Sequence, residues 1–522
     1  MHLPRDPPKT ETVLSDEQKI KDVLSEEAGK YAEEFNGKYL HWSEVCLRDT
    51  GKFDPDTVWA RMKLVRMGSS NTLVFGTTRY RYCISDRILK MLREFDVRAA
   101  AWPFSDTAGL RSDVCYSVNS LMEESIASSQ MEGAATAADK AKEMLRRNSR
   151  PKDKSERMIV NNYRAMMFIK DRIGQQLTPD LIRDIHRIVA EGTMDEKHKG
   201  RFRDNDNVVV QDPLTGEVFH QPIPKEEIGP SVQQLCDFIN DESGFLHPAI
   251  KGIILHYAIA FIHPFEDGNG RVARALFYWY ELKSGYRVME YLALSRYIKD
   301  HKGGYEESYV LGETDGNDIT YFILYNLKAL RESMDRFKGY LRRKTEEERA
   351  ARAESSGRGL NDRQIKVLAD LMGGGFITVK SIENQYNVSL NTARADIKTL
   401  IGLGLLTETG KEVNMKVYSW SGKKIRCPAD TMPNRQDIDA VRQSAERPLT
   451  DPDFFSKAIK RFPLMTLKGI AGPHGSRVHS TSMNAESLVP LCSSVSGTIC
   501  TVLPDLRPDW ISVSKTGESV MM

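Results

Sequence analysis

The sequence HPFEDGNGRVAR, residues 263–274, joins two strongly apolar segments and decides the fold of the chain. Before it, IKGIILHYAIAFI (250–262) places apolar residues at helical spacing. That helix is expected to end just before Pro264, because proline disfavours a helical residue before it. After it, two glycines and an asparagine lead into a second apolar helix, RVARALFYWYEL (271–282). The stretch therefore predicts a short loop between two buried helices.

This loop also carries residues that bind phosphate and move a proton. Glycines at a helix N-terminus let backbone N–H groups approach an anion, and the helix dipole favours its charge. Arg271 and Arg274 lie one turn apart, and two guanidinium groups beside such amides form a polyphosphate site. Asp267 is placed to hold a Mg²⁺ that bridges phosphate oxygens, and His263 can take a proton from a hydroxyl. Together these groups indicate phosphoryl or nucleotidyl transfer.

These residues resemble the signature of the Fic family, His-x-Phe-x-(Asp/Glu)-Gly-Asn-Gly-Arg-x-x-Arg. Every defined position is matched, by His263, Phe265, Asp267, Gly268, Asn269, Gly270, Arg271 and Arg274. The resemblance covers roughly residues 115–340, including GRFR (200–203) and the segment KGGYEES around Tyr305. It implies a protein adenylyltransferase, which uses ATP and Mg²⁺ or Mn²⁺ to attach AMP to Ser, Thr or Tyr hydroxyls of a target protein.

The resemblance also implies a role for each residue of the site. These roles are a general base at His263, a buried anchor at Phe265, a metal ligand at Asp267, α-phosphate contacts from Gly268, Asn269 and Gly270, a β-phosphate contact from Arg271 and a γ-phosphate contact from Arg274. Tyr305, assigned with them to the ATP site, either stacks near the adenine or packs in the core. His186 and His256 lie on apolar helical segments and are expected to be core histidines.

The segment NVVVQDPLTGEVFHQP (207–222) has two apolar runs around a turn sequence and predicts a β-hairpin. It resembles the flap of the family, which aligns a target segment by adding a strand to it. We therefore call residues 207–222 the flap. Val209 and Val210 are its expected contacts with the target.

The segment SSQMEG (128–133) matches the inhibitory pattern of the family, (Ser/Thr)-x-x-x-Glu-(Gly/Asn). Its first and fifth residues are Ser128 and Glu132, inside an expected helix over residues 119–146. The resemblance implies that Glu132 pairs with Arg274 and blocks the productive position of the γ-phosphate. In some relatives the same glutamate orients a water that removes AMP.

The sequence as a whole predicts a mainly α fold, with a Fic helical core, a β-hairpin flap and a C-terminal winged helix-turn-helix. Three apolar helical patterns followed by a two-stranded ribbon indicate the winged helix. The expected boundaries are an N-terminal helical region over 1–114, a catalytic domain with its inhibitory helix over 115–340, a linker over 341–359, the winged helix over 360–420 and a tail without sustained periodicity over 421–522.

The winged helix leaves a second function open. Its third helix offers Asn391, Thr392, Arg394 and Lys398 for contacts with phosphates and bases, while Asp396 offsets part of the charge. DNA and protein are equally favoured partners, so a DNA-binding regulator is the alternative to an enzyme. Another nucleotide-derived transfer is the alternative on the same scaffold. The intact Gly-Asn-Gly-Arg segment favours AMP.

Composition restricts the class of protein further. The net charge is +2 over 522 residues, so any nucleic-acid contact must come from a local patch. Seven scattered cysteines without CxxC pairs favour reduced thiols. With no apolar run long enough for a membrane span and no signal peptide, the expected location is cytoplasmic, without a membrane partner. A homodimer is left open.

Overall fold

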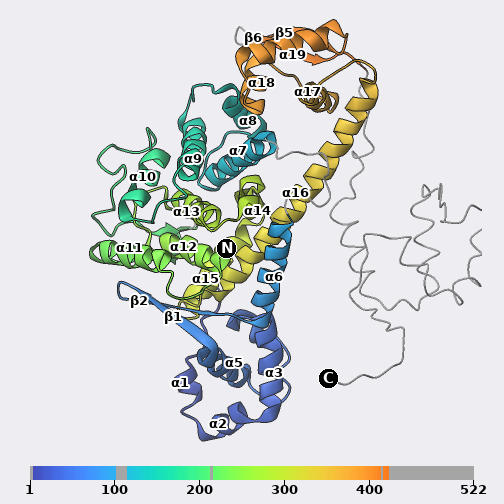
Figure 1. Ribbon diagram of the computed structural model, residues 1–522. Helices are drawn as coiled ribbons and strands as arrows, with labels where there is room; N and C mark the ends of the chain where they lie inside the picture. Colours follow the sequence, from blue (N-terminus) through green and yellow to red (C-terminus); the bar gives the residue numbers. More distant parts are fainter. Residues whose placement is uncertain (1–3, 102–113, 212–214, 413–414, 423–522) are drawn as a thin grey trace, which may run out of the picture. The chain divides into compact units, whose positions relative to one another are not determined.

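A computed structural model describes residues 4–101, 114–211, 215–412 and 415–422 (Figure 1). The described residues are mostly helical, and their strands form three separate two-stranded antiparallel sheets. This confirms the mainly α prediction. None of the helices in these ranges is long and apolar enough to cross a membrane.

The N-terminal region packs against the loop between two later helices of the core. Its elements are α1 (Thr10–Val13), α2 (Glu17–Leu24), α3 (Glu26–Lys38), α4 (Trp42–Val45), α5 (Pro55–Ser69), β1 (Ser70–Phe75), β2 (Thr78–Cys83) and α6 (Asp86–Ala100). Lys63 on α5 donates to Asp315 at 2.6 Å, and the Tyr39 hydroxyl donates to Asp318 at 2.7 Å, all four side chains being buried. Buried charges in such a network tie this region to the core because each would be costly to leave unpaired.

The β1–β2 hairpin was not predicted from the sequence, which indicated only short helical patterns before residue 110. Its two strands pair in register from Ser70–Cys83 to Phe75–Thr78, with Gly76 at φ 63° in the connecting turn. The available signal was the pair of β-prone runs around a two-residue loop that contains glycine. Tyr80, on β2, is fully buried in the main core.

The helical core is built around two antiparallel neighbours, α12 (Pro248–Ile262) and α13 (Asn269–Lys283), which lie side by side in Figure 1. Both helices are buried on almost every residue, as expected for helices that are apolar all round. The other elements of the core are α7 (Val114–Met131), α8 (Ala138–Arg147), α9 (Lys154–Lys170), α10 (Pro179–Val189), β3 (Val210–Gln211), β4 (Val218–His220), α11 (Lys225–Asn240), the 3-10 helix η1 (Arg287–Tyr291), α14 (Leu294–Asp300), α15 (Lys302–Thr314) and α16 (Thr320–Glu354).

One contact between these two central helices predicts a pH-dependent stability. Glu281 on α13 is fully buried, neither carboxylate oxygen has a hydrogen-bond partner, and Gly252 on α12 has no side chain where the carboxyl group lies. Burial, with the nearby charge of Asp96, raises the pKa of Glu281 to about 8. The folded protein therefore holds this proton over a pH range in which the unfolded chain has lost it.

Because the folded-state pKa is raised, the stabilising effect is complete below the ordinary glutamate pKa and is lost as the pH rises towards 8. At pH 7 the free energy of unfolding is roughly 3 kcal/mol below its value at low pH through this group alone. We expect Glu281→Gln, which mimics the protonated acid, to flatten the decline in thermal stability between pH 5 and 8. Glu242→Gln, at an exposed position, is the control. If the thermal stability of the wild-type protein and of Glu281→Gln changed with pH in the same way, the raised pKa of Glu281 would be refuted.

The C-terminal described part has three helices and a ribbon, namely α17 (Asp362–Met372), α18 (Val379–Tyr386), α19 (Leu390–Gly402), β5 (Leu406–Glu412) and β6 (Met415–Trp420). This is the element order predicted for a winged helix-turn-helix. Helix α16 continues to Glu354, so most of the segment expected to be a linker, 341–359, is helical. Ala351 of α16 is buried in the small core of the C-terminal unit. The predicted tail, 421–522, lies almost wholly outside the described residues.

Candidate active site

The loop between α12 and α13 reverses the chain through two residues in the left-handed conformation. His263, which follows the last residue of α12, has φ 51°, and its N–H donates to the carbonyl of Ile259 at 3.1 Å. Gly268, which precedes α13, has φ 88°. A left-handed backbone is costly for a residue with a side chain such as His263, and positions of this kind concentrate at functional sites. The loop therefore holds His263 at a fixed place beside the first turn of α13.

Two buried side chains brace this loop from inside. Phe265 is fully buried and stacks on the His186 ring with centroids 3.8 Å apart. The side chain of Asn269 exchanges hydrogen bonds of 2.9 Å and 2.7 Å with the backbone N–H and C=O of Phe265. Asn269 is only 2% exposed, so its amide group braces the loop and does not face a ligand. The α-phosphate contact expected of Asn269 stays a prediction, and its backbone N–H is available for it.

His186 has a further structural role that was not expected for a core histidine. The N–H of Gly200 donates to its Nδ1 atom at 3.0 Å, so the proton of the ring is on Nε2. The Nε2–H group then donates to the carbonyl of Asp267 at 2.9 Å. Burial lowers the pKa of His186 to about 4, which keeps the ring neutral for this pair of bonds. His186 thus fixes the loop residue expected to bind a metal.

The hydrogen bonding of His263 defines which nitrogen can act as a base. Its Nδ1 atom lies 3.1 Å from the carbonyl oxygen of Ala260, which can only accept, so Nδ1 carries the proton. The lone pair is therefore on Nε2. Burial lowers the pKa of His263 to about 4, so the imidazole is neutral at pH 7. A neutral imidazole with a free Nε2 can accept a proton from a hydroxyl group.

The first turn of α13 provides donors for an anion. The N–H groups of Asn269, Gly270 and Arg271 have no acceptor within the helix, because the first bond of the helix runs from Val272 to Gly268. The Arg271 side chain is 1% exposed, and its Nε atom is buried without a hydrogen-bond partner. We call these three amides with the Arg271 guanidinium the phosphate cradle. Unpaired amides at a helix N-terminus beside a guanidinium are donors of the kind that bind a phosphate group.

Asp267 lies at the edge of this cradle with half of its side chain exposed. One carboxylate oxygen accepts from the N–H of Gly268 at 2.6 Å, and Arg271 lies 3.5 Å away. The neighbouring Glu266 accepts from the side chain of Asn205, which holds its carboxylate away from the cradle. Within the described ranges there is no cluster of three or more metal-binding side chains. A cation here would take its other ligands from phosphate and water, as Mg²⁺ commonly does.

Glu132 reaches this site from the end of α7. Its Oε1 atom accepts from Arg274 at 2.8 Å, and Ser128 accepts from the same guanidinium through its Oγ atom at 2.8 Å and its carbonyl at 3.0 Å. Burial opposes ionisation of Glu132, but Arg274 and Arg271 hold its pKa below the usual value. A Cβ atom on Gly270 would lie 2.3 Å from Oε1 of Glu132. The carboxylate therefore lies directly over the phosphate cradle.

The expected helix over 119–146 is two helices, and its break explains the inhibitory pattern. Helix α7 ends at Met131 because Gly133 adopts φ 91°, and α8 begins only at Ala138. The N–H of Gly133 bonds to Gln130 and that of Ala134 to Ser129, which is a Schellman motif. Glycine and asparagine are the residues that tolerate this conformation. The glycine of the pattern thus ends the helix so that Glu132 extends to Arg274.

The flap forms the predicted hairpin, with Val210 paired to His220 and Gln211 to Val218, and residues 212–214 lie outside the described residues. Val209 and Val210 are both half-buried. Arg203 anchors the base of the flap, because its N–H and Nε donate to the carbonyls of Pro264 at 2.8 Å and His263 at 3.1 Å. The same guanidinium donates to the carbonyl of Ile223 at the other end of the flap. Its role was not predicted, although GRFR was noted.

Tyr305 packs in the core and lies away from solvent. Its hydroxyl bonds to Nε2 of His256 at 2.9 Å and lies 3.2 Å from the Tyr309 hydroxyl, and its ring contacts Phe322. His256 is fully buried beside it, and burial lowers its pKa to about 3, as expected for a core histidine. Of the two positions expected for Tyr305, near the adenine or packed in the core, the structure has it packed in the core.

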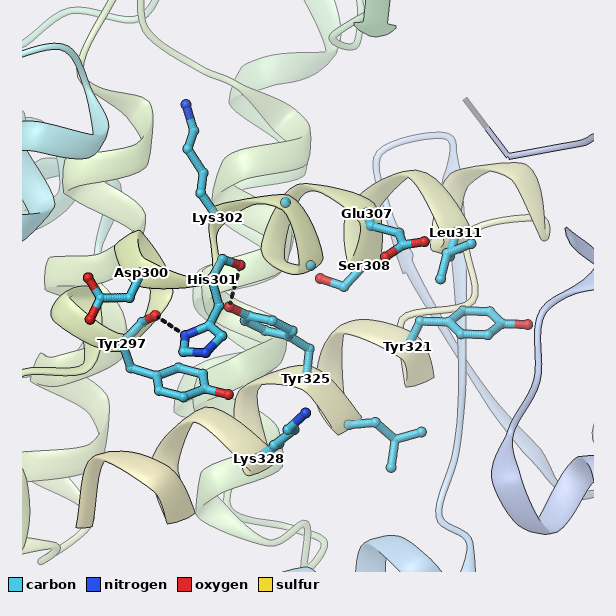
Figure 2. A pocket seen from close by; sticks show the side chains of 13 residues that line it. Tyr297, Asp300, His301, Lys302, Glu307, Ser308, Leu311, Tyr321, Tyr325 and Lys328 are labelled. Atoms are coloured by element: carbon cyan, nitrogen blue, oxygen red, sulfur yellow. Dashed lines mark hydrogen bonds between the residues drawn. The ribbon is translucent and has the colours of Figure 1, made fainter. Parts of the chain in front are cut away.

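A cavity of about 440 Å³ lies between α14, α15 and α16 (Figure 2). Its wall includes His301, whose Nδ1 atom bonds to the Tyr297 carbonyl at 2.9 Å, and Tyr325, whose hydroxyl donates to the His301 carbonyl at 3.2 Å. None of the motif residues 263–274 lines it. The cavity is therefore separate from the phosphate cradle.

The part of the chain that contains this site is similar to known proteins. Residues 176–280 match the Fic/DOC family, so the chain contains a Fic domain. A "Protein adenylyltransferase Fic" of Drosophila willistoni is 33% identical over 125 residues, which cover 23% of this chain and 23% of that protein. The protein of the same name from Nematostella vectensis is 28% identical over 165 residues, covering 31% of this chain and 35% of that one. The matched part is thus about a third or less of each of these relatives.

Two solved structures are similar to part of this chain at low sequence identity. A Fic family protein from Desulfovibrio desulfuricans G20 gives a TM-score of 0.45 at 18% identity, over 66% of this chain and 98% of that one. Fic-1 (residues 134–508) of Caenorhabditis elegans gives 0.41 at 20% identity, over 58% of this chain and 82% of that one.

Proposed function

We propose that this protein is an adenylyltransferase that transfers AMP from ATP to hydroxyl side chains of other proteins. The observation that supports this most is the free Nε2 atom of His263 beside the unpartnered amides of the phosphate cradle. Nε2 takes the proton of the target hydroxyl, whose oxygen forms a bond to the α-phosphorus. The bond from that phosphorus to the oxygen shared with the β-phosphate breaks, and pyrophosphate leaves. Relatives named protein adenylyltransferase support the same reaction.

Different groups of the site hold the three phosphates of ATP: backbone amides, the Arg271 side chain and the Arg274 side chain. The amides of Asn269 and Gly270 hold the α-phosphate, where negative charge increases in the transition state. The expected contact from the Gly268 amide requires that its N–H leave the Asp267 carboxylate, to which it donates at 2.6 Å. Arg271, whose Nε atom has no protein partner, takes the β-phosphate. Arg274 takes the γ-phosphate once Glu132 has left it. This division leaves the α-phosphorus open to attack from the side of His263.

Mg²⁺ or Mn²⁺ fits the Asp267 carboxylate, which is half-exposed and has lone pairs left over from its contacts with Gly268 and Arg271. When bound, the cation neutralises phosphate charge and draws electrons from the breaking bond. Asp267 would hold it at the edge of the phosphate cradle.

We expect Asp267→Ala to lower the rate of AMP transfer at least about tenfold, because one of few protein ligands of the cation is lost. The measurement is incorporation of AMP from α-labelled ATP over a range of Mg²⁺ concentrations. Higher Mg²⁺ should restore part of the activity of the variant. Glu266→Ala is the control, since Asn205 holds that carboxylate away from the cradle. Full activity of the wild-type protein in EDTA would contradict a metal at this site.

The contact between Glu132 and Arg274 supports autoinhibition as part of this function. A carboxylate already bonded to Arg274 competes with the γ-phosphate for the same guanidinium. ATP then binds with its α-phosphate turned away from the line of attack. The same carboxylate, with a quarter of its side chain exposed, can orient a water for removal of AMP from a modified target.

The target is expected to bind along the flap. In the described part of the flap the sheet has two strands, so its outer edges are free for a target segment to add as a further strand. Val209 and Val210 are half-buried on that hairpin and would contact the target's side chains. A target segment held in this way would present its Ser, Thr or Tyr hydroxyl to Nε2 of His263.

A DNA-binding regulator is the second candidate function, favoured by one ion pair in the winged helix. Asp396, expected to offset the positive charge of α19, is 2% exposed and bonds to Arg363 at 2.5 and 3.1 Å. It therefore lies inside the unit and leaves Arg394 and Lys398 on the exposed face. Salt-dependent binding to duplex DNA that is lost in an Arg394→Ala, Lys398→Ala protein would support this function. A protein partner for α19, a homodimer and a cytoplasmic location stay predictions.

The decisive experiment uses ATP labelled at either end. Transfer of the α-label to protein supports adenylylation, whereas transfer of the γ-label supports phosphorylation. The Glu132→Gly protein and the wild type should be incubated separately with a cell lysate, and labelled bands identified by mass spectrometry. The modified residue follows from the same spectra.

A further inference from the structure

His220 joins three elements of the core at one point. It lies on β4 of the flap and is 8% exposed. Its Nε2 atom lies 2.7 Å from the carbonyl oxygen of Phe261 on α12, and its ring packs on the Phe261 ring with centroids 4.6 Å apart. Its Nδ1 atom lies 2.9 Å from each carboxylate oxygen of Glu313 on α15. Both ring nitrogens are therefore bonded to oxygens outside the flap.

These bonds connect the flap to the catalytic loop. Phe261 is two residues before His263, so the carbonyl that His220 contacts belongs to the last turn of the helix that positions the base. On the opposite strand, Val210 is the residue paired with His220. A shift of His220 would move Val210 and every residue of a target strand aligned with it. His220 thus connects the flap strand to the helix that precedes His263.

A two-stranded hairpin is marginally stable alone, so the position of the flap depends on contacts with other elements. In the described residues of the flap, the register is irregular between the pairs Val210–His220 and Gln211–Val218. Arg203 fixes only the base of the flap, through the carbonyls of His263, Pro264 and Ile223. His220 is the second attachment, on the strand itself.

Glu313 is well placed to be the fixed end of this attachment. Its side chain is 22% exposed, and it belongs to the last turn of α15. Two residues later, Asp315 is held by Lys63 at 2.6 Å and by Arg66 at 3.5 Å, both on α5. The N-terminal region thereby immobilises the end of α15 that carries Glu313.

We propose that His220, held by Glu313 and the Phe261 carbonyl, is a positioning residue that sets the flap at the distance from His263 required for transfer to a protein target. This inference rests on the proposed adenylyltransferase function. His220 contacts neither ATP nor the target hydroxyl. Its loss is expected to impair modification of proteins while leaving nucleotide binding and the base intact. A displacement of about 1 Å at a reacting centre can cost roughly 10²-fold in rate.

The test introduces His220→Ala, Glu313→Ala and Glu313→Gln into the Glu132→Gly protein, in the full chain. Glutamine keeps both an acceptor and a donor at this position, so its amide can bond to Nδ1 of His220 in either direction, and Glu313→Gln should retain most of the contact. The control is His247→Ala, which removes a histidine that caps the other end of α12 and bonds to Asp96 at 3.1 Å. This control variant shows how far the loss of a similar hydrogen bond, outside the flap, changes the readouts through lower stability alone.

The first readout is hydrogen–deuterium exchange of the flap amides over 207–211 and 217–221. Faster exchange is expected in His220→Ala and Glu313→Ala, with little change in Glu313→Gln and His247→Ala. The second readout is incorporation of AMP from α-labelled ATP into lysate proteins, compared with release of AMP to water. Protein labelling should fall roughly 10- to 100-fold in the two alanine variants, mainly through a higher apparent KM for protein, while AMP release to water stays within about twofold.

Unchanged flap exchange, or protein labelling equal to that of the Glu132→Gly parent, would overturn the inference. A parent that labels no protein would instead count against the proposed function, and the exchange measurement would still decide whether His220 fixes the flap. Affinity for ATP, measured by calorimetry, should be the same in all the variants. A loss of that affinity in His220→Ala would mean that the residue belongs to the nucleotide site, and would also overturn the inference.

Discussion

Replacing His263 with alanine is expected to lower AMP transfer by roughly 10²–10⁴-fold while leaving ATP affinity nearly unchanged. The side chain contacts the backbone of Ala260 through Nδ1 and is no part of the phosphate cradle. The cradle consists of amides and Arg271, all of which remain. Transfer from α-labelled ATP and ATP binding by calorimetry, measured on the Glu132→Gly protein with and without the substitution, separate the two effects.

The pH dependence provides a second check on this base. Because burial lowers the pKa of His263 to about 4, the imidazole is already unprotonated at pH 5.5, and the rate should not fall between pH 8 and pH 5.5 through this group. An imidazole with the ordinary value of 6.5 would lose most of its activity over the same range. The control variant is His301→Ala, which removes a histidine in the wall of the cavity of Figure 2, which no residue of 263–274 lines. Near-normal transfer by His263→Ala would show that another group accepts the proton.

Replacing Glu132 with glycine is expected to raise AMP transfer by ~10²-fold. Glu132 belongs to the same chain as Arg274, so its effective concentration at the guanidinium is about millimolar or higher. The carboxylate also occupies the space over Gly270, where any phosphate bound to the first turn of α13 must lie. Glycine removes this competitor and leaves the Schellman motif at Gly133, and therefore the end of α7, unchanged.

The matched control is Glu123→Gln, on the same helix. Glu123 pairs with Lys142 of α8 and has no contact with the phosphate cradle. Its replacement should leave labelling at the wild-type level. Equal or lower labelling by Glu132→Gly, measured at equal protein concentration, would show that the contact with Arg274 is structural and that activity is limited elsewhere.

The sequence was sufficient to predict the centre of the fold. The apolar pattern over 250–262 and the motif after it correctly predicted two buried helices joined by a short loop. The flap hairpin followed from two β-prone runs around a turn. In each case the signal is local, since the residues that make the structure are adjacent in the chain.

Contacts between distant segments could not be predicted in this way. Arg203 and His220 are anchored by backbone carbonyls and by Glu313, and a carbonyl has no signature in the sequence. The same holds for Asn269, whose side chain turned inward to Phe265, and for Asp396, which is buried against Arg363. Charge and polarity are visible in a sequence, but the direction of a side chain depends on tertiary packing.

The break between α7 and α8 could be predicted only in part from the sequence. Gly133 is visible in the sequence, and a glycine late in a helical pattern is a known end signal. It was read as part of a motif within one helix, although the alternation of Gly and Asn in that motif already indicates a left-handed residue. The structure adds that this helix end places Glu132 on Arg274.

The central claim is that this chain transfers the adenylyl group of ATP to protein, and the most direct measurement compares two labels. The Glu132→Gly protein is incubated with Mg²⁺, cell lysate and ATP that is labelled either at the α-phosphate or at the γ-phosphate. The proposed chemistry predicts protein-bound label from α-labelled ATP alone, with release of pyrophosphate and with loss of the signal in His263→Ala. Label that reaches protein from the γ-position, or no label from the α-position, would contradict it.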